Sequence, residues 1–255
     1  MHSIPTDHPR YVSLRIRQRM VAGWERGLAV PEGLLAHGRG EAFDYLLGER
    51  TQPEARSAIR AAAANLLLAV RPVISVNGNA ASLVPGEIVA LARAVPGSVV
   101  EVNLFHRSEA RARRIARELE AYAKGTVKVL ATNTDARLPG LSSQRSKTFR
   151  RGMMDADVVF VPLEDGDRAG ALKKAGKRVL AIDLNPLSRT ARVADVTIVD
   201  NIVRALPELI RQVARQKRYP RRRLESLASG FDNAANLRKA LSRMLGRLKA
   251  SDLRF

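Results

Sequence analysis

The sequence predicts an α/β protein built on a Rossmann-like parallel sheet of about six strands, with helical appendages at both ends of the chain. Two observations predict this fold. Short apolar runs alternate with helical patterns from residue 72 to residue 215, which is typical of a doubly wound sheet. Two of these runs stop abruptly in polar, turn-forming residues, as strands do at the carboxyl edge of such a sheet, where ligands bind.

The amino-acid composition limits the kind of core, the metal chemistry and the cellular location that we expect. The 255 residues are 45% hydrophobic but only 4% aromatic, so the core must consist mainly of Ala, Leu, Val and Ile. The absence of cysteine excludes disulfides and thiolate metal sites. No apolar run reaches the roughly 20 residues that span a bilayer, and the first residues lack the apolar core of a signal peptide. We therefore expect a soluble, cytoplasmic protein with no membrane partner.

The formal charge is +19, and about half of it lies in Arg211–Phe255, where thirteen Lys/Arg stand against three Asp/Glu. Such a surface can bind nucleic acid through its phosphates. It can equally steer polyanionic substrates toward an enzyme, or reflect a general bias toward Arg and Ala. Charge alone does not decide among these, and we rate nucleic acid as an improbable partner that charge does not exclude.

Residues 10–28 have the pattern of an amphipathic helix, with Leu14, Met20, Val21 and Trp24 near one face. Arg17 belongs to the polar part of this helix, and such an arginine usually faces solvent. The alanine-rich segment 53–70 predicts a second strong helix that begins at a proline. Its small side chains suit close packing on a sheet or on another subunit, and we expect a buried subunit interface there.

Between these helices lies His37-Gly-Arg-Gly40, which we expect to be a loop, with a helix beginning at Glu41. The glycines would allow close backbone approach to a ligand, and the helix start would favour an anion. Arg39 could then hold a phosphate through two hydrogen bonds. His37 is the histidine best placed for acid–base chemistry, although a single histidine is more often structural. The segment lacks the Gly-Lys-Ser/Thr ending of a Walker A loop.

The core is expected over residues 72–216, after an N-terminal helical segment (1–71) and before basic C-terminal helices (217–255), all in one compact unit. The expected strands are 72–76, 99–105, 127–131, 156–162, 178–184 and 194–199. The expected helices are 85–95, 108–122, 144–153, 169–175 and 202–215, with a long loop over 132–146. That loop is long enough to be a lid over a site or to cross a subunit boundary.

The strongest candidate site follows the strand that ends at Leu184. Pro186 stops the strand, and the polar residues Asp183, Asn185, Arg189 and Thr190 are delivered at its carboxyl end.

A second strand runs into Glu164, Asp165 and Asp167, which could hold Mg²⁺ or simply cap the next helix. After the first strand, Asn77 and Asn79 could bind a polar ligand, or could stand there because Asn-Gly turns tolerate positive φ. The sequence therefore favours a nucleotide-type site over ordinary capped turns. No GxGxxG follows the first strand, which argues against an NAD site.

Several blocks in the same order resemble one family, the archaeal 4-phosphopantoate–β-alanine ligases, also called phosphopantothenate synthetases. The blocks are HGRGEAFD (37–44), SVNGN (75–79), VNLF (102–105), PLEDGDR (162–168) and DLNPLSRT (183–190). IVDNIV (198–203) also fits. The resemblance covers almost the whole chain, whereas the arginines at 221–223 look particular to this sequence.

The resemblance implies an ATP- and Mg²⁺-dependent, homodimeric ligase of coenzyme A biosynthesis. It would join 4-phosphopantoate to β-alanine through an acyl-adenylate and release AMP and diphosphate. Carried over to this sequence, the nucleotide contacts are Arg17, Arg39, Asp183, Leu184, Asn185, Arg189, Thr190, Asn201 and Ile202. Arg39 and His37 are the catalytic candidates, and we assign Asn77 and Asn79 to the pantoyl side. The alternatives are a nucleic-acid-binding protein that uses the basic C-terminal helices and another nucleotide-dependent enzyme.

Overall fold

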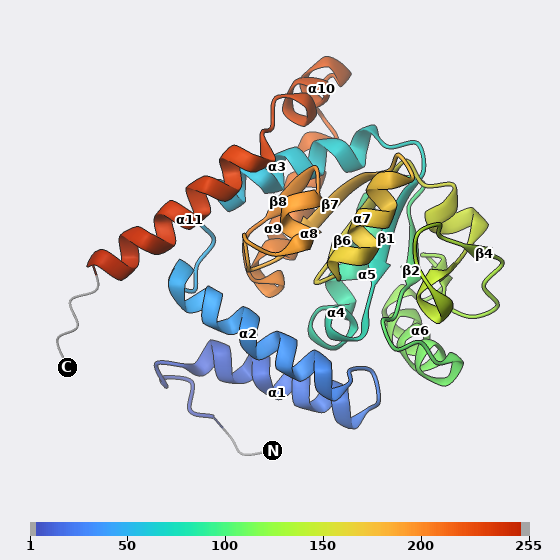
Figure 1. Cartoon of the computed structure of the whole chain (residues 1–255), viewed down its shortest axis with the longest axis horizontal. Coiled ribbons are helices and arrows are strands. Elements are labelled where there is room, and N and C mark those ends of the chain that lie inside the picture. Colours follow the sequence, from blue (N-terminus) through green and yellow to red (C-terminus); the bar gives the residue numbers. More distant parts are fainter. Residues whose placement is uncertain (1–3, 251–255) are drawn as a thin grey trace.

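The computed structural model describes residues 4–250 and contains a six-stranded, fully parallel sheet in the order β3-β2-β1-β6-β7-β8 (Figure 1). Its strands are β1 (Pro72–Val76), β2 (Val99–Val102), β3 (Val129–Leu130), β6 (Val158–Pro162), β7 (Arg178–Ile182) and β8 (Val196–Ile198). The predicted fold class and strand number are confirmed. The strand order changes direction between β1 and β6, and in this class of sheet ligands bind in the crevice at that point.

Helices cover both faces of the sheet because the central strands are apolar on both sides. On one face lie α3 (Pro53–Leu68), α5 (Pro85–Ala94), α6 (Glu109–Ala123) and α9 (Ile202–Gln216). On the other lies α7 (Gly166–Lys174), packed against the alternate side chains of β6 and β7. Next to it, α8 (Arg189–Val193) begins directly after the β7 turn.

The first two helices are α1 (Tyr11–Glu25) and α2 (Pro31–Leu47). They lie together at the end of the sheet where the strands finish (Figure 1). The predicted break before Glu41 is wrong, since α2 runs through His37–Gly40 without interruption. The apolar face predicted for α1 is also partly wrong, because Met20 is buried whereas Val21 and Trp24 are 42% and 47% exposed.

The alanine-rich helix α3 is confirmed, but its small side chains are covered by the chain itself. Six of its alanines are at most 2% exposed, against α9, β8 and α10 (Arg221–Ser229). This surface therefore cannot serve as the subunit interface that we expected from its composition.

The Asn77–Asn79 segment is not a loop but the start of a short helix, α4 (Gly78–Leu83). The Asn77 side chain caps this helix by accepting a hydrogen bond from the backbone N–H of Ala80, 3.0 Å away. Gly78 is required by packing, since a Cβ there would lie 2.2 Å from the carbonyl oxygen of Leu28.

The helix predicted over residues 144–153 is wrong. The chain instead forms a small antiparallel pair, β4 (Ala136–Arg137) with β5 (Lys147–Thr148), joined through the 3₁₀ turn η1 (Ser143–Ser146) and followed by the π-type turn η2 (Arg150–Met154). The cause is a buried carboxylate. Glu101, 0% exposed, accepts hydrogen bonds from the Thr148 hydroxyl and the Met153 N–H, and a Cβ at Gly152 would come within 2.0 Å of its Oε2.

The predicted basic C-terminal helices are present as α10 and α11 (Asn233–Ala250), although residues 251–255 of the predicted segment lie outside the described part. Leu237 packs against α2 and α8, whereas Leu245 and Leu248 are more than half exposed. Within residues 4–250 no helix is both long and apolar enough to cross a bilayer. The division into segments 1–71, 72–216 and 217–255 stays a prediction.

Candidate active site

A cleft of about 730 Å³ lies at the carboxyl ends of β6 and β7, between those strand ends and α2. Its volume falls within the usual range for small-molecule sites, roughly 300–1,000 Å³. The predicted site residues that line it are His37, Arg39, Asn79, Glu164, Asp183, Leu184, Asn185, Arg189, Thr190, Asn201 and Ile202. The structure thus brings together residues that are up to 165 positions apart in the chain, between His37 and Ile202.

The turn after β7 forms the polar floor of the cleft. Asp183 Oδ1 accepts from the backbone N–H of Asn185 at 2.9 Å, and Asp183 Oδ2 accepts from the Ser188 hydroxyl. Ser188 Oγ in turn accepts from Ala191 N–H and so caps α8. Burial raises the pKa of Asp183, and these two hydrogen bonds oppose that rise. The turn therefore holds the Asp183 carboxylate in a fixed position at the carboxyl end of β7. Its oxygens keep lone pairs that can accept from a ligand hydroxyl.

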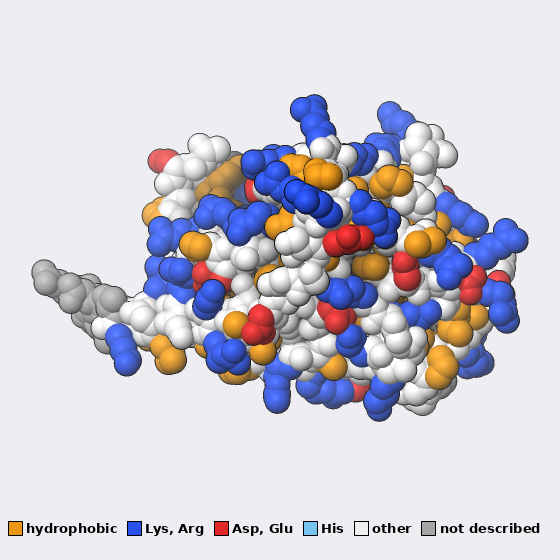
Figure 2. All heavy atoms as spheres, turned by 90° about the horizontal axis from the view of Figure 1, so that it is seen from above, with side chains coloured by type: hydrophobic (Ala, Val, Ile, Leu, Met, Phe, Trp, Pro, Cys, Tyr) orange, Lys and Arg blue, Asp and Glu red, His pale blue; other side chains and the backbone are white. Residues whose placement is uncertain are grey.

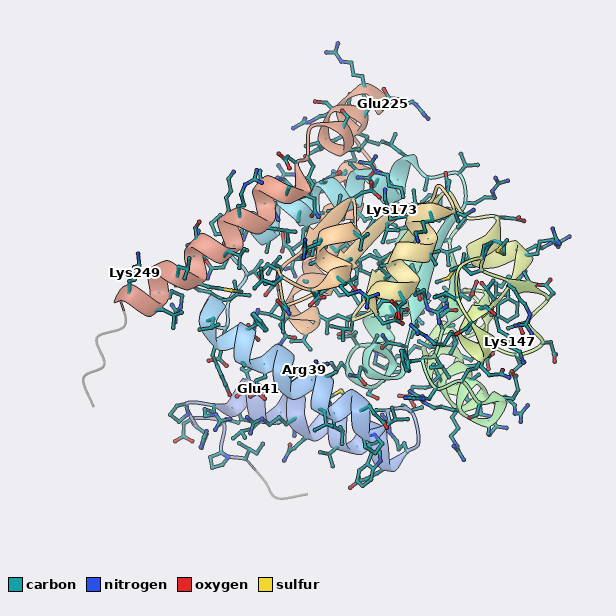
Figure 3. All side chains as sticks on the ribbon, in the orientation of Figure 1. Arg39, Glu41, Lys147, Lys173, Glu225 and Lys249 are labelled. Atoms are coloured by element: carbon teal, nitrogen blue, oxygen red, sulfur yellow. The ribbon has the colours of Figure 1, made fainter. Side chains whose placement is uncertain are left out.

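Helix α2 forms the opposite wall. Arg39 projects from it into the cleft, is exposed, and its guanidinium has no hydrogen-bond or ion-pair partner among residues 4–250 (Figure 3). Gly40 lies next to it, and a Cβ there would stand 3.5 Å from Leu184 Cδ1. This is an ordinary van der Waals distance, so α2 lies against the β7 turn at this point. Arg39 therefore reaches the cleft from the middle of helix α2, and not from the loop that we expected.

A cluster of charged side chains lies beside the cleft. Asp165 caps α7, and Asp165 Oδ1 also receives the Arg145 guanidinium at 2.5 Å. Asp167 binds two arginines, Arg145 at 3.2 Å and Arg189. Arg189 remains 72% exposed, so this ion pair can exchange for a ligand phosphate.

The three acids predicted as metal ligands are thus engaged with arginines, as Glu164 is with Arg168. In the part of the chain that the structure describes, no group of three His, Cys, Asp or Glu side chains is placed to hold a metal ion. Glu164, Asp165 and Asp167 therefore do not form a preassembled cation site.

Glu164 lies at the end of β6, with its side chain only 5% exposed. Burial raises the pKa of this carboxyl to about 7, although the Arg168 guanidinium, 3.4 Å away, opposes the rise. Ser75 donates to Glu164 Oε2 at 3.3 Å, and the Thr190 hydroxyl donates to the Glu164 carbonyl oxygen at 2.8 Å. These contacts tie the ends of β1 and β6 to the start of α8.

Asn201 and Ile202 close the cleft at the start of α9. The Asn201 side chain caps α9 by accepting from Val203 N–H, and it donates to Asp44 at 2.8 Å. Arg204 binds the same Asp44 carboxylate together with Asp200. This buried set fixes the C-terminal half of α2 to α9.

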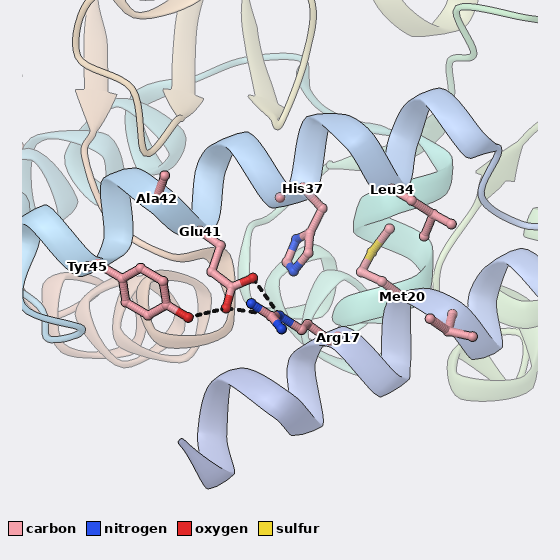
Figure 4. Close-up of a pocket in the computed structure, with 9 residues that line it drawn as sticks. Arg17, Met20, Leu34, His37, Glu41, Ala42 and Tyr45 are labelled. Atoms are coloured by element: carbon pink, nitrogen blue, oxygen red, sulfur yellow. Dashed lines mark hydrogen bonds and ion pairs between the residues drawn. The ribbon is translucent and has the colours of Figure 1, made fainter. Parts of the chain in front are cut away.

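Arg17 does not line this cleft. It projects from α1 into a second pocket of about 350 Å³ on the other side of α2, where its Nε binds Glu41 at 2.8 and 3.1 Å (Figure 4). Glu41 also accepts from the Tyr45 hydroxyl, and these hydrogen bonds lower its pKa against the effect of burial. His37 lines both pockets, and burial lowers its pKa, which favours the neutral ring. The structure therefore separates Arg17 from the other predicted nucleotide contacts.

The two asparagines assigned to the pantoyl side differ in position. Asn79 lines the cleft, while its Nδ2 donates to the Gly33 carbonyl oxygen at 2.8 Å. Asn77 does not line it, because its side chain joins the ends of β1 and β6 through hydrogen bonds to the Pro162 and Leu163 carbonyl oxygens.

Sequence reasoning missed part of the α2 wall. Ala36, Gly40 and Phe43 line the cleft with Arg39, at the i, i+3, i+4 and i+7 positions of one helix face. This helical spacing can be read from the sequence, but not if the helix is assumed to begin at Glu41, because three of the four residues then fall outside it. Leu163, a cleft residue in the left-handed region at φ 54°, gave no sequence signal.

Taken together, the doubly wound sheet and this cleft define a Rossmann-like α/β protein with a cleft of small-molecule size at the carboxyl edge of its sheet. Comparison with known proteins narrows the class. Residues 54–247 match the family model described as phosphopantothenate/pantothenate synthetase. Because this match covers more than half of the chain, the chain belongs to that family, and the resemblance seen in its motifs is confirmed.

Curated relatives agree over nearly the full length. A protein of Thermococcus kodakarensis is 50% identical over 248 residues, 97% of this chain and 94% of the relative. One of Thermococcus onnurineus is 51% identical over the same length. One of Methanosarcina mazei is 47% identical over 249 residues, 98% of this chain and 97% of the relative. Each of these three is named 4-phosphopantoate–β-alanine ligase.

Proposed function

We propose that this protein is an ATP-dependent ligase that joins 4-phosphopantoate to β-alanine and yields 4′-phosphopantothenate, AMP and diphosphate. The observation that carries the proposal is the cleft itself. It gathers an unpaired arginine, a second exposed arginine, and a rigid aspartate at the carboxyl ends of adjacent strands, in a chain of this family. Such a site can hold a nucleotide with its ribose at the strand end and its phosphates under the cations.

The chemistry requires cations of this kind. A carboxylate is a poor electrophile, so the pantoate carboxylate oxygen would attack the α-phosphorus of ATP and expel diphosphate, giving an acyl-adenylate. The amine of β-alanine would then attack the acyl carbon, form the amide, lose a proton and release AMP. Negative charge accumulates on phosphate oxygens in the first step, and positioned guanidinium groups stabilise it. We assign this role to Arg39, which is already unpaired, and to Arg189, which would leave Asp167 for the phosphates.

The remaining cleft residues suit binding and orientation. Asp183 would accept from ribose hydroxyls, while Leu184 and Ile202 provide apolar contact and Asn185 a polar one. Arg17 as a nucleotide contact stays a prediction, and it requires movement of the Arg17–Glu41 pair. Asn79 is better placed than Asn77 for the pantoyl group.

Mg²⁺ would accompany the ATP phosphates, since it prefers phosphate oxygens to protein-only cages. Because Glu164, Asp165 and Asp167 are engaged by arginines, we assign no step to a metal held by them. The homodimer and the cytoplasmic location also stay predictions. If the protein is dimeric, its interface must lie elsewhere than on the alanines of α3.

The test is a product assay with ATP, Mg²⁺, 4-phosphopantoate and β-alanine. We expect AMP and diphosphate only when both organic substrates are present. With ¹⁸O in the pantoate carboxylate, one label should appear in AMP, because that oxygen bridges carbon and phosphorus in the adenylate. Formation of ADP would assign a phosphoryl-transfer reaction instead, and unlabelled AMP would exclude the acyl-adenylate.

A further inference from the structure

A dense group of cations lies on the end of α9, the turn that follows it and the start of α10, away from the cleft. Residues 211–223 contain seven Lys/Arg and no Asp/Glu. Two of the seven are paired, Arg211 with Glu208 and Arg221 with Glu225. The other five form the basic surface, and none of them has a carboxylate partner within residues 4–250: Arg215, Lys217, Arg218, Arg222 and Arg223.

This basic surface lies at the opposite end of the sheet from the cleft. Arg178, the first residue of β7, donates to the Ala228 carbonyl oxygen of α10, whereas Asp183 follows the last residue of the same strand. Five strand residues span about 17 Å, which exceeds the Debye length of roughly 8 Å at physiological ionic strength. In Figure 1 α10 and α2 lie at opposite ends of the molecule. The basic surface therefore does not serve to draw anionic substrates into the cleft.

The surface is prearranged for phosphate. The Arg223 guanidinium lies over the Tyr219 ring, 3.9 Å from its centroid, so its position is fixed while its N–H groups stay available. Four of the five cations are arginines, whose planar groups bind phosphates through paired hydrogen bonds. Tyr219 itself is half-buried against the apolar cluster of α3 and α10, which anchors the ring beneath Arg223. Figure 2, which views the molecule from the side of α10, shows Lys and Arg side chains far outnumbering acidic ones.

The side chains around the basic surface indicate whether it suits an anionic membrane or a nucleic acid. A helix that enters a membrane interface needs an exposed apolar face beside its cations, and no large hydrophobic side chain of α9 or α10 is exposed. The buried residues of α10, Leu224 and Ala228, are used for packing on α3. We propose that the basic surface of α9 and α10 binds the phosphate backbone of nucleic acid.

The proposal predicts the strength and salt dependence of binding. If all five cations contact phosphates of a single strand, the slope of log K against log salt is about −3.5, and each contact contributes roughly fivefold at 0.1 M salt. Neutralising the surface should therefore weaken binding by at least about 100-fold. The substitutions are Arg215→Gln, Lys217→Gln, Arg218→Gln, Arg222→Gln and Arg223→Gln, all at exposed positions.

A matched control removes the same net charge elsewhere. Its substitutions are Arg113→Gln, Arg114→Gln, Arg117→Gln, Lys124→Gln and Lys128→Gln, also at exposed positions on and beside α6. Because distant charges are screened, the control should change affinity by no more than about threefold. Both variants should keep the wild-type melting temperature, so a loss of RNA binding would not reflect a loss of folding.

The measurement is fluorescence anisotropy of a labelled 20-nucleotide RNA with the full-length chain, from 50 to 300 mM KCl. Loss of binding in the α9–α10 variant, with binding retained in the control, supports the proposal. Equal loss in both variants would show that only net charge matters and would overturn it. Equally tight binding of polyglutamate, or binding of phosphatidylserine vesicles but not RNA, would overturn it as well.

Discussion

Replacing Arg39 with alanine tests the assignment of the cleft most directly. The side chain is exposed and has no partner within residues 4–250, so its removal should change the free energy of unfolding by less than about 0.5 kcal/mol. A hydrogen bond between charged groups contributes roughly 1.5–3 kcal/mol. The Kd for ATP should therefore rise by about 10- to 150-fold. Titration calorimetry with a non-hydrolysable ATP analogue measures this change.

Two variants make the result specific. Arg39→Lys keeps the charge but loses the paired donors, so its affinity should lie between those of the wild type and Arg39→Ala. Arg117→Ala removes an exposed arginine on α6 that does not line the cleft, and this variant should bind ATP as the wild type does. Wild-type affinity in a folded Arg39→Ala protein would refute the placement of the phosphates beneath α2.

Three further predictions concern stability. Arg204→Met leaves the buried carboxylates of Asp44 and Asp200 without their ion-pair partner, so the free energy of unfolding measured in urea should fall by roughly 3–5 kcal/mol. A fall of less than about 1 kcal/mol would contradict the buried pairing. Gly152→Ala places a Cβ within 2.0 Å of Glu101 Oε2 and should cost roughly 1–3 kcal/mol by the same measurement, whereas a neutral effect would show that the η2 turn can yield. The pKa of Glu164 is raised from 4.5 to about 7, so the stability associated with this group is present below pH 4.5 and is lost as pH rises through 7. Glu164→Gln should remove that loss and gain up to about 3 kcal/mol over the wild type between pH 4.5 and pH 7.5, and a pH-independent difference would contradict the raised pKa.

The parts of the site that could be predicted are those determined by local sequence. The residues after β6 and β7 follow uninterrupted apolar runs, and Pro186 marks the point where β7 cannot continue. A turn at the end of a parallel strand has one possible location, the carboxyl edge of the sheet. The fold class alone therefore places Asp183–Asn185 and Ser188–Thr190 at the cleft.

The parts that could not be predicted depend on how helices dock. Gly38 and Gly40 suggested a loop, because glycine destabilises an isolated helix by about 1 kcal/mol. In the folded chain α2 is held by contacts made elsewhere, including the Asp44–Arg204 ion pair. Likewise, periodicity places Arg17 on the polar side of α1 but cannot say which side of α2 it will meet.

The same local ambiguity affected residues 144–153. Their composition is compatible with a helix, but the buried Glu101 carboxylate, more than forty residues earlier, takes the hydrogen bonds of Thr148 and Met153. A long-range polar contact of this kind leaves no periodic signal. Asn77 shows the converse case, since an asparagine that looked like a ligand contact is a helix cap joining two strands.

The docking of α2 also has a consequence for synthesis on the ribosome. Leu47 is buried against Leu237 and Met244, and Asp44 bonds to Asn201, 157 positions later. The wall of the cleft is thus among the first segments to leave the ribosome, but its partners are among the last. At 5–20 residues per second, the intervening 200 residues take roughly 10–40 s. During that time α1 and the start of α2 can already pack on α4, which follows them closely in the chain. The C-terminal half of α2 gains its partners only once α9 and α11 have been released, so this wall of the cleft is completed at the end of synthesis.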